Sequence, residues 1–271
     1  MEDQKAIVVG ISGCSSSGKT TLARLLRDIF PNTFILHEDD FYKPEEELPI
    51  KDGLVDWDCA EAISIPDMQK ALTHIRTTGT FPPFIDSKED QNTIGACPAS
   101  SAQIAAAKQA VQAWLAPGQP GSLIFSPSSP NPPPPRICLL DGFLLFSPPL
   151  IPTITSLIDI KLFLLVSRAA ATRRRQARDG YVTLEGFWAD PPGYVDRIVW
   201  PNYAESHAWL FEAGNVEGKL DEKALATLDV RAQTEKGLDV DFGGETLPWA
   251  VEAVMKELER IVLGGGGEGS K

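Results

Sequence analysis

Residues 13–20, with the sequence GCSSSGKT, constrain this chain more than any other segment. They match the pattern G-x-x-x-x-G-K-[ST], in which glycines let several backbone N–H groups approach anionic oxygens without side-chain clash. The lysine adds a point charge, and the last hydroxyl is a ligand for a metal ion. The segment therefore predicts a loop that binds the phosphates of a nucleoside triphosphate.

The residues on either side of this loop have the pattern that the motif requires. Residues 6–12 form a continuous apolar run rich in β-branched side chains, which predicts a strand covered on both faces. In residues 20–30, apolar side chains recur on one helical face until Pro31 ends the segment. An incidental Gly/Ser turn would not require this order of strand, loop and helix.

We expect the loop to bind ATP together with Mg²⁺. Lys19 would reach the β- and γ-phosphates, and the Thr20 hydroxyl would bind the metal. The helix that follows adds the positive end of its dipole. The residues predicted to contact the nucleotide here are Gly13, Ser15, Ser16, Ser17, Gly18, Lys19, Thr20 and Thr21.

Composition disfavours several classes of protein. The net charge of −12 disfavours nucleic-acid binding, which depends on neutralising phosphates with basic side chains. The sequence has neither a signal peptide nor an apolar run of about 18 residues, so we expect no membrane segment. The four cysteines are widely spaced and lack a C-x-x-C pair, which predicts reduced thiols in a cytoplasmic or nuclear compartment.

Acidic residues follow two further predicted strands. Asp39 and Asp40 come after the strand predicted at residues 33–37, and Asp141 comes after the apolar run 136–140. Ligands bind at the carboxyl ends of strands in a parallel α/β sheet, so these side chains are placed to accept a proton or to hold Mg²⁺. The alternative for Asp39 and Asp40 is that they cap the next segment.

Trp57 and Asp58 have the residue types of a nucleoside site. The indole offers a flat face for a ring, and the carboxylate offers two acceptors for vicinal hydroxyls. Taken alone, a tryptophan beside an aspartate is more often a packed residue with a satisfied indole.

Four arginines lie within residues 172–181 of this otherwise acidic chain. Arginine donates planar pairs of hydrogen bonds to phosphate, so we interpret this segment as a lid over the triphosphate. The alternative is a solvated charged face. The helical period places Arg174 and Arg178 on one face, with Arg175 offset from it.

A single P-loop kinase domain over residues 1–271 accounts for the length of the chain. We predict a three-layer α/β P-loop NTPase fold with a parallel sheet of about five strands, helices on both faces and an arginine-rich lid. Residues 77–135 form a first predicted insertion, poor in core-forming residues and Pro-rich at its end, and residues 212–237 a second. The last strand is predicted at residues 238–242, and residues 264–271 are expected to be a disordered tail.

Taken together, these motifs resemble those of the nicotinamide riboside kinases, which are P-loop nucleoside kinases. The sequences DDF, DGFLLF and VWP are more specific for this family than the phosphate loop is. The two insertions fit a fungal-type form. Besides the phosphate loop, the resemblance rests on residues 39–41, 57–58, 141–146, 173–175, 192–194 and 199–201.

The resemblance implies transfer of the ATP γ-phosphoryl group to the ribose 5′-hydroxyl of nicotinamide riboside, in NAD biosynthesis. Nicotinic acid riboside would be a further substrate. Asp39 is similar to the family's catalytic base and lies near Mg²⁺, and Lys19 is the second catalytic residue. Thr20 and Asp141 are similar to the other groups near the metal, with the shorter Asp141 reaching it through water.

The resemblance also implies the groups that bind the nucleoside. Asp58 and Arg175 are similar to the pair that holds the ribose hydroxyls, and Arg174 and Arg178 to lid residues that face ATP. The second ring-stacking aromatic falls on Tyr181, in a lid that is one residue longer than is usual. The remaining residues expected at the substrate are Asp39, Asp40, Phe41, Tyr42 and Trp57.

Two other functions remain open at this point. A pyrimidine nucleoside kinase of the same fold would need donors and acceptors for the edges of its base, whereas an aromatic sandwich suits a cationic pyridinium. A non-catalytic nucleotide-binding protein would not need Asp39 or Asp141. We expect a monomer or weak dimer with a small-molecule nucleoside as its partner.

Overall fold

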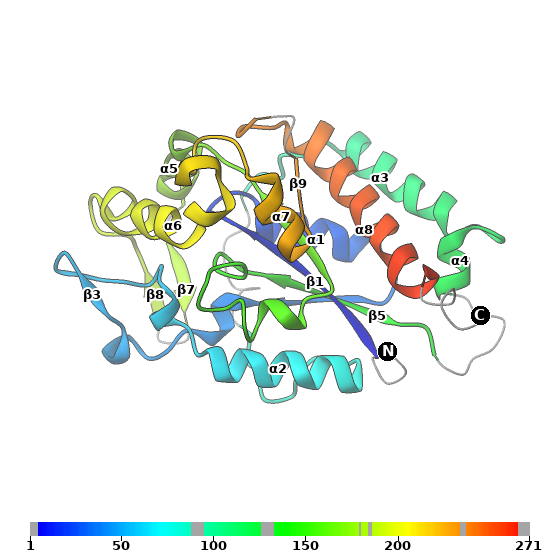
Figure 1. The fold of residues 1–271 in the computed structure, drawn as a ribbon, viewed down its shortest axis with the longest axis horizontal. Coiled ribbons are helices and arrows are strands. Elements are labelled where there is room, and N and C mark those ends of the chain that lie inside the picture. The colour runs from blue at the N-terminus through cyan, green and yellow to red at the C-terminus, as the bar shows by residue number, and fades with distance from the viewer. Residues whose placement is uncertain are drawn as a thin grey trace.

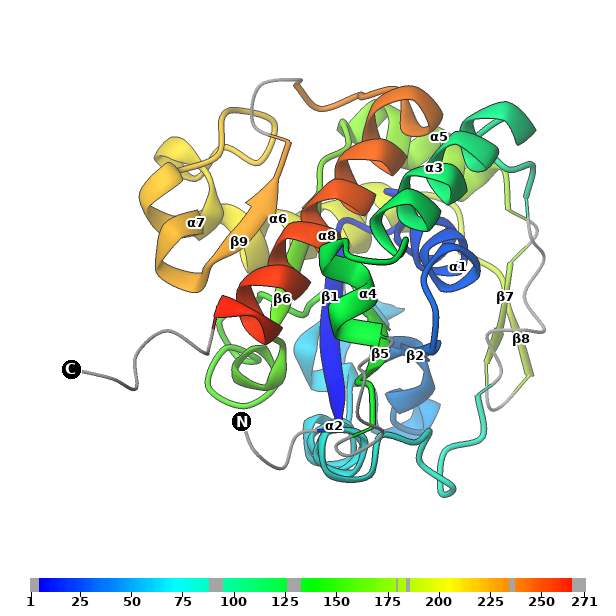
Figure 2. The ribbon, with the colours of Figure 1, turned by 90° about the vertical axis from the view of Figure 1, so that its right-hand side faces the viewer.

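Five parallel strands form the central sheet, and helices cover both of its faces (Figures 1 and 2). The structure, a computed structural model, describes residues 5–87, 95–125, 133–178, 180–183, 186–233 and 237–264, with residues 181–183 described by their backbone. The strand order is β2-β5-β1-β6-β9, so β1 lies in the middle of the sheet. This arrangement confirms the α/β fold that the sequence predicts.

The elements have the following bounds. The strands of the sheet are β1 Ala6–Gly13, β2 Thr33–His37, β5 Arg136–Asp141, β6 Ile160–Leu164 and β9 Val230–Ala232. The helices are α1 Lys19–Ile29, α2 Ile65–Thr78, α3 Ser101–Trp114, α4 Pro120–Phe125, α5 Arg168–Gln176, α6 Trp200–His207, α7 Glu222–Leu228 and α8 Leu247–Val262. Two short hairpins, β3 Ile50–Lys51 with β4 Leu54–Val55 and β7 Tyr181–Thr183 with β8 Gly186–Trp188, lie at the left of Figure 1. Within these described residues, every helix is too short or too polar to cross a membrane.

Strand β1 is buried along its whole length because both of its faces are covered. Ala6 and Val8 pack into one core with helix α2, while Ile7 and Val9 pack into a second core with α1 and α8. This two-sided burial explains the continuous apolar run in the sequence. All five strands run the same way, so their carboxyl ends meet at one edge of the sheet.

Helices α3 and α4 come from the first predicted insertion, residues 77–135, and they contribute to the core. Val111, Trp114 and Ile124 are buried, and the Trp114 Nε1 donates a hydrogen bond to Glu259 of α8 (2.6 Å). Figure 2 shows these two helices beside α1 and α8. Our expectation that this insertion is poor in core-forming residues is therefore wrong for α3 and α4. The alanines of α3 give a weak periodic signal, which hides the few large residues on its buried face.

The first predicted insertion, residues 77–135, begins at the end of α2 and ends at the start of β5, and both ends lie beside Lys5. The Lys5 backbone N–H donates to the Arg76 carbonyl near the end of α2 (2.8 Å). The Lys5 carbonyl accepts from the N–H of Arg136, the first residue of β5 (3.1 Å). This junction lies at the amino edge of the strands, opposite the edge where β1 leads into the phosphate loop.

Parts of the predicted insertions and tail lie outside the described residues. These parts are residues 88–94, 126–132, 234–236 and 265–271. They include much of the proline-rich end of the first insertion and all but the first residue of the predicted tail.

Strand β9 comes from within residues 212–237, the second predicted insertion. Our prediction of the last strand at residues 238–242 is wrong, because the alternation of acidic and apolar residues there has another cause. Asp239 accepts hydrogen bonds from the N–H (3.1 Å) and the hydroxyl (2.7 Å) of Ser167, at the start of α5. Asp241 accepts from a backbone N–H of the helical turn that follows it. The two acids therefore cap helical segments.

His207, the last residue of α6, is completely buried against the sheet. Its Nδ1 lies 3.1 Å from the backbone oxygen of Tyr203, and its ring lies 5.5 Å from that of Phe163 on β6. Burial lowers the pKa of His207 to about 4. Between pH 6.5 and 4, His207 is therefore neutral in the folded protein and protonated in the unfolded chain.

We predict that His207 lowers the free energy of unfolding by about 3 kcal/mol as the pH drops from 6.5 towards 4. The buried Glu38, whose pKa burial raises to about 8, acts in the opposite direction over an overlapping range, so the contribution of His207 is measured as a difference between variants. His207→Phe keeps an aromatic ring but cannot titrate, so it should become more stable relative to the parent protein as the pH drops. Urea unfolding of both proteins at several pH values measures the difference. His74→Gln on the partly exposed face of α2 is the control. A difference in the free energy of unfolding between His207→Phe and the parent protein that stays constant over this pH range would contradict the prediction.

Candidate active site

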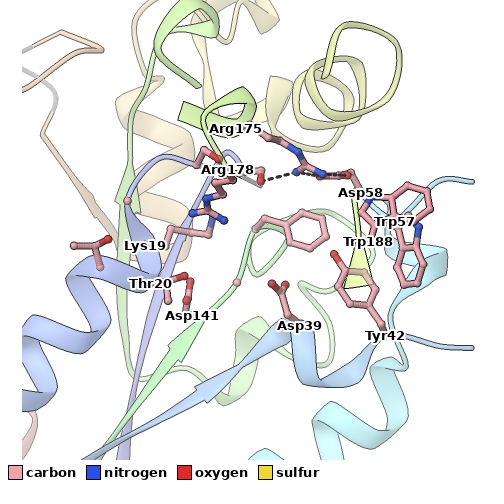
Figure 3. A pocket seen from close by; sticks show the side chains of 16 residues that line it. Lys19, Thr20, Asp39, Tyr42, Trp57, Asp58, Asp141, Arg175, Arg178 and Trp188 are labelled. Carbon is pink, nitrogen blue, oxygen red and sulfur yellow. Dashed lines mark hydrogen bonds and ion pairs between the residues drawn. The ribbon is translucent and has the colours of Figure 1, made fainter. Parts of the chain in front are cut away.

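A cavity opens at the carboxyl edge of the sheet, between the phosphate loop and the lid (Figure 3). It gathers residues from segments that are far apart in the sequence. Its walls are Ser15, Ser16, Gly18, Lys19, Thr20, Thr21, Asp39, Tyr42, Trp57, Asp58, Asp141, Gly142, Phe143, Arg175, Arg178 and Trp188. Most of the site residues predicted from the sequence are among them.

The phosphate loop joins β1 to α1 with its polar groups turned inward. Ser16 (φ 63°) and Gly18 (φ 106°) have left-handed backbone conformations. A Cβ at Gly13 would overlap the backbone oxygen of Leu164, so only glycine fits there. The hydroxyl oxygens of Ser16 and Ser17 are buried without a hydrogen-bond partner among the described residues, and α1 begins without a side-chain cap. These unpaired groups fit the oxygens of a phosphate.

Lys19, Thr20 and Asp141 lie together where α1 begins and β5 ends (Figure 3). The Lys19 Nζ donates to the Cys14 carbonyl across the loop (3.0 Å). Burial alone would raise the pKa of Asp141, but His37, whose Nδ1 lies 3.3 Å from its Oδ2, reverses the shift together with Lys19 and Thr20 and holds this pKa below its usual value. The ionised carboxylate and the hydroxyl are hard oxygen donors, which fit Mg²⁺.

Metal ligands are few at this position. Among the residues that the structure describes, no group of three or more His, Cys, Asp or Glu side chains gathers into a metal centre. A magnesium ion at Thr20 and Asp141 would therefore take its remaining ligands from phosphate oxygens and water, as this ion commonly does.

Asp39 projects into the cavity from the turn after β2, and the buried Glu38 beside it fixes that turn. One oxygen of Glu38 accepts hydrogen bonds from the N–H groups of Phe143 (2.6 Å) and Leu144 (3.0 Å). Burial raises the pKa of Glu38 to about 8. These bonds tie the end of β2 to the loop after β5, and therefore hold Asp39 in place relative to Asp141.

Arg175 of helix α5 is buried in a network that joins three parts of the cavity. Its guanidinium makes two hydrogen bonds to Asp58 (3.1 and 3.3 Å), two to Asp190 (2.6 and 3.0 Å) and one to the Ser15 hydroxyl (2.7 Å). Burial raises the pKa of Asp58, although Arg175 opposes this shift. The pair predicted from the sequence, Asp58 and Arg175, is thus in direct contact at the cavity wall.

Arg174 and Arg178 line different hollows. Helix α5 ends at Gln176, so the prediction that they share one helical face is wrong. Arg178 borders the main cavity, while the Arg174 Nη1 lies 3.5 Å from the backbone oxygen of Ser17 and borders a second hollow on the other side of the phosphate loop. The other walls of this second hollow are Ser17, Phe163, Leu164, Leu165, Gln233, Leu238, Val240, Phe242 and Thr246.

Four aromatic side chains, Tyr42, Trp57, Phe143 and Trp188, form one end of the main cavity. The ring centres of Trp57 and Trp188 are 5.5 Å apart, with the planes tilted by 52°. Tyr42 packs edge-on against Trp57 at 5.2 Å, and its ring is roughly parallel to that of Phe143 at 6.4 Å. This end of the cavity offers aromatic faces to a flat ring.

Trp188 reaches the cavity from the β7–β8 hairpin, which continues the lid beyond α5. Its Nε1 donates to Asp190 (3.2 Å), the same carboxylate that binds Arg175. Tyr181, the aromatic predicted for this position, pairs with Trp188 in the backbone register of the hairpin, and its side chain is not among those that the structure describes.

Other predicted site residues lie outside the wall of the main cavity. Phe41 is buried in the core beneath it, where it packs rather than faces a ligand. Asp40 is absent from the cavity wall, although its neighbour Asp39 belongs to it. Gly13 lies beneath the phosphate loop against β6, and Ser17 borders the second hollow.

The sequence does not predict five residues of this site, which are Glu38, Gly142, Phe143, Trp188 and Asp190. Asp190 stands directly before two prolines, a position that indicates a rigid turn but not a salt bridge. Trp188 lies in a segment without a distinctive motif. Phe143 lies within the DGFLLF sequence, which indicates the family but not that Phe143 lines the cavity. The only indication for Glu38 in the sequence is that it is the first of three consecutive acidic residues after a predicted strand.

The parallel sheet, the phosphate loop and the strand-end carboxylates define a P-loop kinase. The nicotinamide riboside kinase of Schizosaccharomyces pombe is 34% identical to this chain over 256 residues, which cover 94% of this chain and 99% of the relative. The nicotinamide riboside kinase of Saccharomyces cerevisiae is 35% identical and covers 82% of this chain, with 85% of the relative covered. Nicotinamide riboside kinase 1 of Homo sapiens is 28% identical, with 73% and 75% covered.

The chain belongs to the nicotinamide riboside kinase family. This confirms the resemblance stated from the motifs, including the fungal-type form, since the two fungal relatives cover more of the chain at higher identity than the human one. No protein-family model matches the sequence.

Proposed function

We propose that this chain catalyses the ATP-dependent phosphorylation of nicotinamide riboside at its ribose 5′-hydroxyl, and that nicotinic acid riboside is a further substrate. The observation that carries the proposal is a single cavity with a phosphate loop at one end and aromatic walls at the other. Between them lie the Asp58–Arg175 pair and Asp39. The family membership supports the same activity.

On the nucleotide side, the phosphate loop and Lys19 would hold the β- and γ-phosphates. The second hollow, bordered by Arg174 and Phe242, would hold the base of ATP, because it adjoins the loop and offers apolar and aromatic contacts. Thr20 and Asp141 would hold Mg²⁺, which when bound neutralises charge on the phosphates. Arg178 at the cavity wall would add donors to the transferred group.

On the nucleoside side, Asp58 and Arg175 would hold the two ribose hydroxyls. The Trp57 and Trp188 faces would stack on the pyridinium, whose positive charge is attracted to aromatic faces. This leaves the 5′-hydroxyl directed towards the phosphate loop, where Asp39 accepts its proton as the new bond forms. The protein then acts mainly by positioning the two substrates and stabilising charge.

A substrate panel tests this function. Purified protein with ATP and Mg²⁺ should consume nicotinamide riboside with a kcat/KM at least about tenfold above that for uridine or cytidine, since a cationic ring gains more from aromatic faces than a neutral one. Product formation is measured by chromatography, with nicotinic acid riboside included. Faster turnover of uridine would make the protein a pyrimidine nucleoside kinase. Binding of ATP without turnover of any nucleoside would make it a non-catalytic binding protein.

Asp39→Asn tests the assignment of the base. We expect kcat to fall roughly 10²- to 10⁴-fold, the range that is usual when a general base is lost, while ATP still binds. Asp40→Asn is the matched control, because Asp40 is absent from the cavity wall, and it should retain most of the activity. Equal turnover of Asp39→Asn and the parent protein would exclude Asp39 as the base.

Trp188→Leu tests the second ring-stacking residue. Loss of one aromatic face should raise the KM for nicotinamide riboside about tenfold and leave the KM for ATP unchanged, while Trp188→Phe should keep most of the affinity. Tyr181→Leu, on the paired strand of the hairpin, is the comparison. If Tyr181→Leu has the larger effect on the nucleoside KM, the stacking role belongs to Tyr181, as the sequence alone suggests.

A further inference from the structure

Residues 241–246, which we call the 241–246 loop, form a helical turn before α8 and lie beside both the second hollow and the phosphate loop. Phe242 borders that hollow, and its ring packs against the phosphate loop, where a Cβ at Gly18 would lie 3.1 Å from its Cε2. Asp241 caps the turn, and Thr246 leads directly into α8. The position of this loop therefore decides the shape of the hollow in which the base of ATP is proposed to bind.

Two residues of the first predicted insertion, Ala99 and Gln103, pack against this loop. Gly243 is buried, and a Cβ added there would overlap the Gln103 Oε1 and lie 3.0 Å from the Cα of Ala99. Both contacts come from the start of α3. Neither Gln103 nor Ala99 belongs to the wall of the cavity proposed to bind the nucleoside.

Gln103 is held in a fixed orientation by the helix that it belongs to. Its Oε1 accepts from the Ser100 N–H (2.8 Å) and lies 2.9 Å from the Ser100 hydroxyl oxygen, which in turn accepts from the Gln103 N–H (3.3 Å). This reciprocal capping box stops the glutamine from swinging away from Gly243. Gln103 therefore contacts Gly243 from a fixed position and not as a freely moving side chain.

Helix α3 is itself anchored to the two helices that border the loop. Trp114 packs edge-on against Phe30 at the end of α1 (6.2 Å) and donates a hydrogen bond to Glu259 of α8. Val111 is buried in the same core. Figure 2 shows α3 alongside α1 and α8, so the start of α3 is held at the phosphate-loop end of these helices.

We propose that helix α3 positions the 241–246 loop and thereby sets the affinity for the nucleotide without contributing to nucleoside binding. This inference rests on the proposed function, because it assigns the second hollow to the base of ATP. A loop that is already held in its binding conformation does not lose conformational freedom when the ligand arrives, and the affinity rises accordingly. Gln103 and Gly243 are then positioning residues for the nucleotide.

Gly243→Ala tests the inference, because the added Cβ must push the loop away from α3. We expect the dissociation constant for ATP, measured by equilibrium dialysis without nucleoside, and the KM for ATP to rise about tenfold. The KM for nicotinamide riboside should change less than about twofold. Gly95→Ala is the matched control, since it lies in the same insertion with no atom within 4 Å of the added Cβ, and it should behave like the parent protein.

Gln103→Ala gives an independent measurement if Gly243→Ala folds poorly in thermal unfolding. This variant removes the side chain that contacts Gly243 without adding an atom to the loop, and it should raise the dissociation constant for ATP about threefold. The double variant Gly243→Ala, Gln103→Ala should bind ATP more tightly than the product of the two single effects predicts, because the main steric conflict is gone.

Three results would overturn the inference. They are ATP binding by both variants equal to that of Gly95→Ala, equal increases in the KM values of both substrates, and strictly additive effects in the double variant. Failure of the proposed function would be seen separately, as a parent protein that does not phosphorylate nicotinamide riboside. The dialysis with ATP alone would still measure the contact between α3 and the loop in that case.

Discussion

The ion-paired guanidinium of Arg175 fixes the relative positions of the parts that make up the cavity. Its partners come from the phosphate loop, from the segment after β4 and from the end of the β7–β8 hairpin. Transfer of a guanidinium out of water costs several kcal/mol, and this cost is offset only when its donors are matched by well-placed acceptors. A displaced lid would leave a buried charge without its partners. The network therefore favours one closed arrangement of the lid over the phosphate loop.

The network also links the two recognition elements for the nucleoside. Asp190 binds Arg175 and the Trp188 indole at once, so the group proposed to hold the ribose and the ring proposed to stack on the base share one carboxylate. A change at Trp188 can therefore affect Asp58 through Asp190 and Arg175. Under the proposed function, this network couples binding of the ribose to stacking of the ring.

The sequence was sufficient for those parts of the site that depend on local geometry. The phosphate loop, Asp39 and Asp141 each lie at or just beyond the carboxyl end of a strand, and a parallel sheet brings the ends of its strands together. Asp190, Trp188 and Glu38 could not be found in this way, because their roles arise from contacts between segments more than one element apart. The same limit explains the strand expected at residues 238–242, where alternating acids serve as helix caps.

The junction beside Lys5 has a consequence for how proteins of this architecture change in length. The two ends of residues 77–135 meet there, so the entropy lost in closing this part of the chain grows only slowly as residues are added. The junction is at the amino edge of the sheet, a full strand length away from the reacting groups. Changes in the length of this part of the chain are thus compatible with an unchanged geometry at the phosphate loop.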